Sequence, residues 1–350
     1  MKIYLDHAAT TPVSKEVVQA IYDVYQKPVH ERTGYLEKAT RGIEKLIGAE
    51  NESVYFASGG TEANALAIQM HIENNKHRGK RILISSIEHA SVMNTCRAYE
   101  KEGYEIVEMP VCSDGVLDIE LAKELVTADT ILVCLMYYNN EVGTRQPIET
   151  LFEYLKPLGI PLHVDAIQAL GKTDLKPIGN TMSFSAHKLN GPKGIGAIYS
   201  DKPINRCDCS INEALAYGFY VALNRAIQNL DANVTHMQML KAKLIDALLN
   251  LSVQIDVIRT KAYDHPGIVN VHVPSLDGDA LVIRLSMAGI CISSGSACSS
   301  GAISVSHVLK AMGMDMAKAK RSVRFSIGIE TTDADIAYVV MVLDKITKGL

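Results

Sequence analysis

Short apolar segments alternate with amphipathic ones from about residue 53 to residue 200. The apolar runs are rich in β-branched and other strand-forming residues, and they predict strands at Val54–Ala57, Arg81–Ser85, Tyr104–Met109, Thr130–Tyr137, Leu162–Asp165, Met182–Ser185 and Ile195–Ser200. The segments between them predict helices at Thr61–Asn74, Ala90–Lys101, Asp118–Val126 and Ile148–Leu158. This alternation is typical of an α/β domain with a mostly parallel sheet.

The order of elements changes beyond residue 230. Val234–Leu251 has the pattern of a long amphipathic helix that leads out of the first domain. The following segments predict a smaller α+β unit, with strands at Ile268–Val273, Cys291–Ser293 and Val323–Ile327 and helices at Asp279–Met287, Ser304–Met312 and Asp333–Lys348. We therefore expect a large domain over residues 11–232 and a small domain over residues 233–350, on which residues 1–10 dock.

Length and composition fit this division. The chain has 350 residues, which exceeds the size at which one hydrophobic core usually stops growing, and 47% of the residues are hydrophobic. A net charge of −4 without a long basic block argues against nucleic acid and anionic membranes as partners. The seven cysteines are odd in number and scattered, and the first residues lack the pattern of a signal peptide, so we expect reduced thiols in the cytoplasm and no metal site.

A lysine stands at the end of an apolar strand. Met182–Ser185 is followed by Ala186, His187 and Lys188, and then by a glycine-rich turn over residues 191–196. A lone lysine after a strand is usually solvated surface. Here the glycines allow the backbone to approach a ligand, and strand ends in α/β sheets are where ligands bind.

Two glycines precede the first predicted helix. In Ser58–Glu62, Gly59 and Gly60 stand between a strand and the helix that opens near Thr61. Exposed backbone N–H groups at a helix start bind phosphate, although a Gly-Gly pair is more often only a tight turn. The segment matches neither the P-loop nor the dinucleotide-binding pattern.

Asp165 ends the strand that precedes the Lys188 strand, so both side chains are expected at one edge of the sheet. An aspartate at this point commonly caps a turn. A carboxylate is also what keeps the ring nitrogen of pyridoxal phosphate (PLP) protonated. The phosphate cradle, Asp165 and Lys188 together therefore predict a PLP site, with Lys188 as the Schiff-base lysine.

With these motifs the chain resembles the cysteine desulfurases, a branch of the class V aminotransferase superfamily. The resemblance covers most of the chain, and it is carried by Ile3–Pro12, Ser58–Glu62, Ile87–His89, Asn139–Gly143, Asp165–Gln168, Ser183–Lys188, Ser293–Cys298 and Val323–Gly328. It implies the fold type I architecture of PLP-dependent transferases: a seven-stranded, mostly parallel sheet with one antiparallel strand, plus a small C-terminal α+β domain.

The resemblance also implies roles for single residues. Catalysis is implied for Lys188, His89 and Cys298; cofactor binding for Gly60, Thr61, His89, Asp165, Gln168, Ser185, His187 and Lys188; and binding of the substrate carboxylate for Asn140 and Arg324. The implied reaction converts L-cysteine to L-alanine and leaves a persulfide on Cys298. A homodimer and an acceptor or scaffold protein for iron–sulfur clusters or thio-cofactors are the implied partners.

Cys298 lies in a run of serine and glycine, Ser293–Gly301. Such a run predicts a loop rather than a packed helix or central strand, and a loop of small residues buries little. A lone cysteine is often a small buried hydrophobe, but in this setting we expect an accessible, reactive thiol.

Two segments depart from the family pattern. Gln26–Tyr35 is shorter than the family's Asn-Pro-x-Ser-x-His type segment. Asp201–Phe219 replaces a glycine-rich segment with arginines and a threonine that, in the family, completes the partner subunit's phosphate site. The change is expected to weaken PLP binding, to alter the dimer or to require a partner subunit.

Two other functions therefore remain open from the sequence. One is a different class V PLP enzyme, either an aminotransferase or a selenocysteine lyase, and Cys298 discriminates because a transaminase would not need it. The other is a degenerate PLP-binding subunit that is active only with a partner chain.

Overall fold

The computed structural model describes residues 2–204, 211–258, 264–294 and 305–348. A seven-stranded sheet forms its larger part, in the order β2 (Val54–Ala57), β8 (Gly196–Ser200), β7 (Thr181–Ser185), β6 (Leu162–Asp165), β5 (Thr130–Met136), β3 (Arg81–Ser85) and β4 (Glu105–Met109). β8 runs antiparallel to both of its neighbours, and every other adjacent pair is parallel. The predicted sheet, including its one antiparallel strand, is confirmed.

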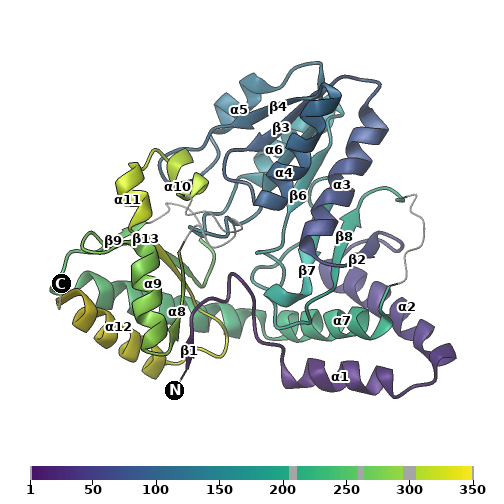
Figure 1. Ribbon diagram of the computed structural model, residues 1–350. Helices are drawn as coiled ribbons and strands as arrows, with labels where there is room; N and C mark the ends of the chain where they lie inside the picture. Colours follow the sequence, from purple (N-terminus) through teal and green to yellow (C-terminus); the bar gives the residue numbers. More distant parts are fainter. Residues whose placement is uncertain (1, 205–210, 259–263, 295–304, 349–350) are drawn as a thin grey trace.

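Helices cover both faces of this sheet (Figure 1), and the alternation of side chains along the strands sends residues to each face. Leu83, Val133 and Leu135 point into one core. This core is completed by α1 (Lys15–Tyr25), α2 (Val29–Ile47), α5 (Ile119–Leu125), α6 (Ile148–Leu155) and α7 (Glu213–Gln228). Ile82 and Ile84 point the other way, into a core shared with α3 (Gly60–Asn75) and α4 (Ala90–Ala98).

Three of these helices were not predicted from the sequence: α1, α2 and α7. α2 begins in a polar stretch with Gly34, and the residues it buries, Ala39, Ile43, Glu44 and Ile47, lie in its second half. α7 lies in part within the segment 201–219, which has no counterpart in the family pattern. The two helices pack on each other, as at Gly42, where an added Cβ would lie 2.3 Å from the Tyr220 ring. Tertiary packing rather than a strong apolar period therefore decides their conformation.

The C-terminal part has its own sheet and core. Its four antiparallel strands lie in the order β12 (Ser293–Ser294), β13 (Ser322–Ser326), β10 (Ile268–His272) and β9 (Asp256–Ile258). The helices of this part are α8 (Leu230–Leu249), α9 (Gly278–Met287), α10 (His307–Ala311), α11 (Met316–Lys320) and α12 (Asp333–Lys348). The single strand predicted at Cys291–Ser293 is wrong, because the chain there forms β11 (Ile290–Cys291) and then β12 in a different sheet.

The first residues of the chain join the C-terminal part before they enter the large one. β1 (Ile3–Tyr4) pairs in parallel with β11, and Ile3 and Leu5 are buried in the same core as Val271 and Phe325. From β1 the chain then passes between the two sheets to α1 (Figure 1). We call its central stretch, residues 6–11, the strap. Among the described residues, no helix is long and apolar enough to cross a membrane.

Candidate active site

One cavity of about 710 Å³, partly open to solvent, lies where the strap meets the carboxyl ends of the parallel strands. It is lined by Gly60, Thr61, His89, Asn140, Asp165, Gln168, Ser185, His187, Lys188 and Arg324, together with Ala8, Ser91, Met136 and Ile167. All of the predicted site residues that the structure describes therefore share this cavity. Cys298 lies outside the described residues.

Lys188 reaches the cavity from a short turn that follows β7. Its Nζ donates hydrogen bonds to the backbone oxygens of Ala8, at 2.6 Å, and Ala9, at 2.7 Å. The backbone oxygen of Lys188 accepts a hydrogen bond of 2.7 Å from Lys172 Nζ. Burial, and then the nearby charge of Lys188, lower the pKa of Lys172 to about 7.

Asp165 is held in place at the end of β6. Its Oδ1 accepts from the backbone N–H of Ile167 at 3.0 Å, and its Oδ2 accepts from Asn64 Nδ2 at 2.9 Å. Asn64 stands one turn into α3 and is fully buried, and it also donates to Ser91 Oγ at 2.8 Å. Two N–H donors suit an ionised carboxylate, so Asp165 is arranged to present a fixed negative charge.

A buried chain of hydrogen bonds extends from Asn64 away from the cavity. Asn64 Oδ1 can only accept, so His163 Nε2, at 3.0 Å, must carry the proton. His163 Nδ1 then accepts from the Thr181 hydroxyl at 2.9 Å, and Thr181 in turn accepts from His71 Nε2 at 2.9 Å. This pattern holds because burial lowers the pKa of both imidazoles and keeps them neutral, and together they fix which way the Asn64 amide faces.

This arrangement predicts a loss of stability in mild acid. Burial lowers the pKa of His163 to about 3 and that of His71 to about 4, from an ordinary 6.5. Between pH 6.5 and pH 4 the unfolded chain binds protons that the folded chain does not, so the free energy of unfolding falls as the pH falls. Each histidine contributes roughly 1.4 kcal/mol per pH unit in this window. Urea midpoints measured across it should fall less steeply for His71→Gln than for the wild type, and equal slopes would contradict the assignment.

A second carboxyl group lies near Asp165 but in a different state. Glu88 is fully buried, and burial followed by the charge of Asp165 raises the pKa of Glu88 to about 8. Its Oε1 accepts from Ser85 Oγ and from the backbone N–H of Met136, each at 2.7 Å. Glu88 is therefore protonated at neutral pH, and Asp165 is the carboxylate that faces the cavity.

His89 is the N-cap of α4, so its ring is fixed at the cavity wall. Its Nδ1 accepts from the backbone N–H of Ser91 at 3.1 Å, which leaves the proton on Nε2. Burial lowers the pKa of His89, an effect that Asp165 opposes and Lys188 reinforces. His89 is thus a neutral imidazole whose Nε2 bonds to none of the described residues, so it is able to exchange a proton with a bound group.

The start of α3 and its surroundings fit a phosphorylated ligand. The N-cap of α3 is Gly59, which has no side chain to cap the first turn. A Cβ added to Gly60 would lie 2.4 Å from Ile167 Cδ1, so a larger residue there would displace Ile167, which lines the cavity. Ser185 Oγ and Gln168 Oε1 are buried and have no hydrogen-bond partner among the described residues, and both residues line the cavity. Buried polar atoms without partners in a cavity indicate a missing polar ligand. With Asp165 and Lys188 at the same cavity, the residues fit PLP.

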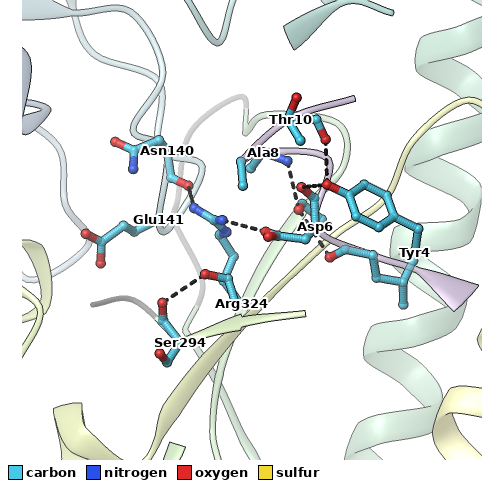
Figure 2. A network of polar contacts seen from close by, with 12 residues as sticks. Tyr4, Asp6, Ala8, Thr10, Asn140, Glu141, Ser294 and Arg324 are labelled. Atoms are coloured by element: carbon cyan, nitrogen blue, oxygen red, sulfur yellow. Dashed lines mark hydrogen bonds and ion pairs between the residues drawn. The ribbon is translucent and has the colours of Figure 1, made fainter. Parts of the chain in front are cut away.

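Arg324 and Asn140 also line the cavity. Arg324 lies on β13 with its side chain only 4% exposed. Figure 2 shows its guanidinium between the backbone oxygen of Asn140, at 2.7 Å, and the carboxylate of Asp6, at 2.8 Å. Arg324 Nε is buried and has no hydrogen-bond partner in the part of the chain that the structure describes. A guanidinium has five N–H donors, so donors remain for a carboxylate ligand.

Sequence reasoning missed the strap and Asn64. The strap contributes the Ala8 and Ala9 oxygens and the Asp6 carboxylate, and Thr10 Oγ1 lies 3.1 Å from His187 Nδ1. Residues 6–11 have no period that would predict such a role, because their contacts are made by backbone atoms and small side chains. Asn64 could have been found from its position one helical turn after Gly60, which places it on the same face of α3.

Comparisons with known proteins point to one family. The family model for "Aminotransferase class-V" matches residues 3–207 and 210–339. The chain is 33% identical to "Cysteine desulfurase IscS" of Dictyoglomus turgidum over 100% of this chain and 95% of that protein. It is 35% identical to "Putative cysteine desulfurase IscS 1" of Bacillus subtilis, over 95% of this chain and 94% of that protein.

Solved structures agree with these relatives. A "NIFS-LIKE PROTEIN" superimposes with a TM-score of 0.92 at 30% identity, over the whole of both chains. "SspA in complex with cysteine" superimposes with a TM-score of 0.77 at 27% identity, over 95% of this chain and 100% of that one. The similarity therefore extends across both sheets and includes the strap.

Proposed function

The chain belongs to the cysteine desulfurases of the class-V aminotransferase family, and from this premise we propose that it uses PLP to convert L-cysteine to L-alanine with a persulfide on Cys298. The observation that carries the proposal is the shared cavity, which brings together residues from β6, β7, β13, α3 and the strap. When bound, PLP supplies an electron sink for the carbon that carries the amino group.

The chain's own residues divide the work of binding. The start of α3 at Gly60 and Thr61, with Ser185 and His187, would hold the phosphate. Asp165 would hold a proton on the ring nitrogen, and Gln168 would contact the phenolic oxygen. Asn140 and Arg324 would orient the substrate by its carboxylate, because a guanidinium binds a carboxylate through paired N–H donors.

Other groups would move protons and sulfur. Lys188 is the amine expected to hold the cofactor and, once released, to take the proton from the substrate carbon. His89 is a neutral imidazole, and its Nε2 would exchange protons with the bound substrate in the steps that Lys188 does not serve. The Cys298 thiolate would attack the substrate sulfur, so that an S–S bond forms and the C–S bond breaks. The electrons of the broken C–S bond stay with the carbon skeleton, which takes up a proton and leaves as L-alanine.

We further propose a homodimer that passes the persulfide sulfur to an acceptor protein for iron–sulfur clusters or thio-cofactors. In the family pattern the segment at residues 201–219 completes the partner's phosphate site. In this chain the end of that segment forms part of α7, so the phosphate site of the dimer would differ from the family pattern. Sedimentation of the purified chain tests the dimer, and an active monomer would contradict it.

The direct test of the reaction is a purified chain loaded with PLP and supplied with L-cysteine. L-Alanine should form in an amount equal to the sulfur released, and a reductant should increase turnover by clearing the persulfide. Formation of pyruvate or a keto acid instead of alanine would contradict the proposal.

Cys298→Ala should lower alanine formation by about 100-fold, because the nucleophile that accepts the sulfur is lost. The visible absorbance of the bound cofactor should remain, since no cofactor contact is proposed for Cys298. Cys112→Ala is the matched control, because Cys112 is an exposed free cysteine that does not line the cavity. Equal rates for the two variants would show that sulfur leaves without Cys298.

A further inference from the structure

We propose that Asp6 is a positioning residue that sets the affinity of the site for the substrate carboxylate. It would hold the Arg324 guanidinium in place, and its negative charge would oppose that of a substrate carboxylate bound to the same guanidinium. This inference rests on the proposed function, because it assigns Arg324 to the carboxylate of an amino acid.

The geometry of Asp6 is that of a built contact rather than a chance surface pair. Its Oδ1 lies 2.8 Å from Arg324, and the two side chains are 17% and 4% exposed. The strap that carries Asp6 is fixed on both sides of the residue. The Tyr4 hydroxyl donates to the backbone oxygens of Asp6, at 3.0 Å, and Thr10, at 2.8 Å, and the Ala8 N–H donates to Ser326 Oγ at 2.9 Å (Figure 2).

The same strap connects the Arg324 contact to the catalytic lysine. Asp6 is two residues before Ala8, whose backbone oxygen accepts from Lys188 Nζ and from Gln168 Nε2. The strap thus joins a residue of the C-terminal sheet to two residues that follow strands β6 and β7 of the large sheet. Asp6 fixes the position of the guanidinium relative to Lys188. The distance between the guanidinium and Lys188 decides whether one amino acid can place its carboxylate at Arg324 and its amino group at the cofactor.

Charge gives Asp6 a second effect. A substrate carboxylate bound by Arg324 must come within roughly 6–7 Å of the Asp6 carboxylate, because both would accept hydrogen bonds from one guanidinium. Solvent screening is weak for groups that are mostly buried, so the two negative charges repel each other. The wild-type site therefore binds carboxylates less tightly than Arg324 alone would allow.

Two substitutions separate the hydrogen bond that Asp6 makes to Arg324 from the repulsion between Asp6 and the substrate carboxylate. Asp6→Asn keeps an acceptor oxygen for Arg324 and removes the charge, whereas Asp6→Ala removes both. The measurement is the concentration of amine that half-saturates the change in cofactor absorbance, with L-cysteine and L-alanine as carboxylate-bearing amines and cysteamine and ethylamine as their counterparts without a carboxylate. Asp256→Asn is the matched control, because Asp256 forms an ion pair of 2.9 Å with Lys318 and does not line the cavity.

Asp6→Asn should lower the half-saturating concentrations of L-cysteine and L-alanine about threefold to tenfold, and Asp6→Ala should raise them at least about tenfold. Neither should change those of cysteamine and ethylamine, and Asp256→Asn should change none. Equal effects on amines with and without the carboxylate, or no effect of Asp6→Asn, would overturn the proposal. Binding of L-alanine involves no sulfur chemistry. A chain without desulfurase activity would therefore contradict the proposed function, while the L-alanine measurement would still test the role of Asp6.

Discussion

Lys188→Ala should abolish alanine formation from L-cysteine, with a loss on the order of 10⁴-fold or more. Lys188 combines two tasks, since its amine is expected to hold the cofactor and then to move the substrate proton. Among the described residues, Lys188 is the one lysine that lines the cavity, and the nearby Lys172 Nζ is engaged with the Lys188 backbone oxygen. The assay is alanine formation at saturating PLP, with the visible absorbance of the protein recorded in parallel.

Lys193→Ala is the control for this variant. Lys193 is exposed in the glycine-rich turn that follows Lys188, and it does not line the cavity. The control should keep both activity and colour. If Lys188→Ala protein, reduced with borohydride and then unfolded and dialysed, keeps the near-ultraviolet absorbance of the reduced cofactor as the wild type does, the cofactor is bonded to another residue.

The large sheet could be predicted from the sequence because its strands are short apolar runs bounded by turns. β2, β3 and β6 have the predicted bounds, and the rest of that sheet differs by a residue at an end. The candidate site was also accessible to sequence reasoning where its residues end strands or begin helices, as Asp165 and Gly60 do. In parallel strands the carboxyl ends lie at one edge of the sheet. That residues such as Asp165 and Gly60 lie close together therefore follows from the order of strands and helices along the chain.

The parts that sequence reasoning missed depend on contacts between distant segments. Asp6 is 318 residues from Arg324, and no local pattern relates them. Ala8 and Ala9 act through backbone oxygens, which any residue would supply. α2 and α7 are helices because each covers the other, as the close approach of Gly42 to Tyr220 shows. Such features follow from tertiary structure and not from propensity.

Asp165→Asn should lower the rate of alanine formation about 10³-fold while the protein still binds PLP. The substitution keeps the size of the side chain and removes the fixed charge that would hold a proton on the ring nitrogen. Without that proton the ring accepts electrons poorly, and removal of the substrate proton becomes the slow step. The phosphate end of the cavity, at Gly60 and Ser185, is untouched, so the cofactor should remain bound.

The hydrogen-bond network sharpens this prediction. An asparagine at position 165 would direct an N–H₂ group either at the Ile167 N–H or at Asn64 Nδ2, both of which donate. Asn64 cannot turn its amide to compensate, because its Oδ1 accepts from His163 Nε2. At least one hydrogen bond is lost, at about 1–3 kcal/mol of stability. A second variant is therefore needed to separate the loss of this contact from the loss of charge.

Asn64→Ala supplies that comparison. It removes the hydrogen bond to Asp165 Oδ2 and leaves the carboxylate charged, so it should lower the rate of alanine formation about tenfold at most. The ratio of the rates of alanine formation by Asn64→Ala and Asp165→Asn measures the effect of the charge on Asp165. In addition, a deuterium label on the substrate α-carbon should slow Asp165→Asn more than the wild type, because proton removal has become limiting. If Asn64→Ala is as slow as Asp165→Asn, the position of the carboxylate matters and its charge does not.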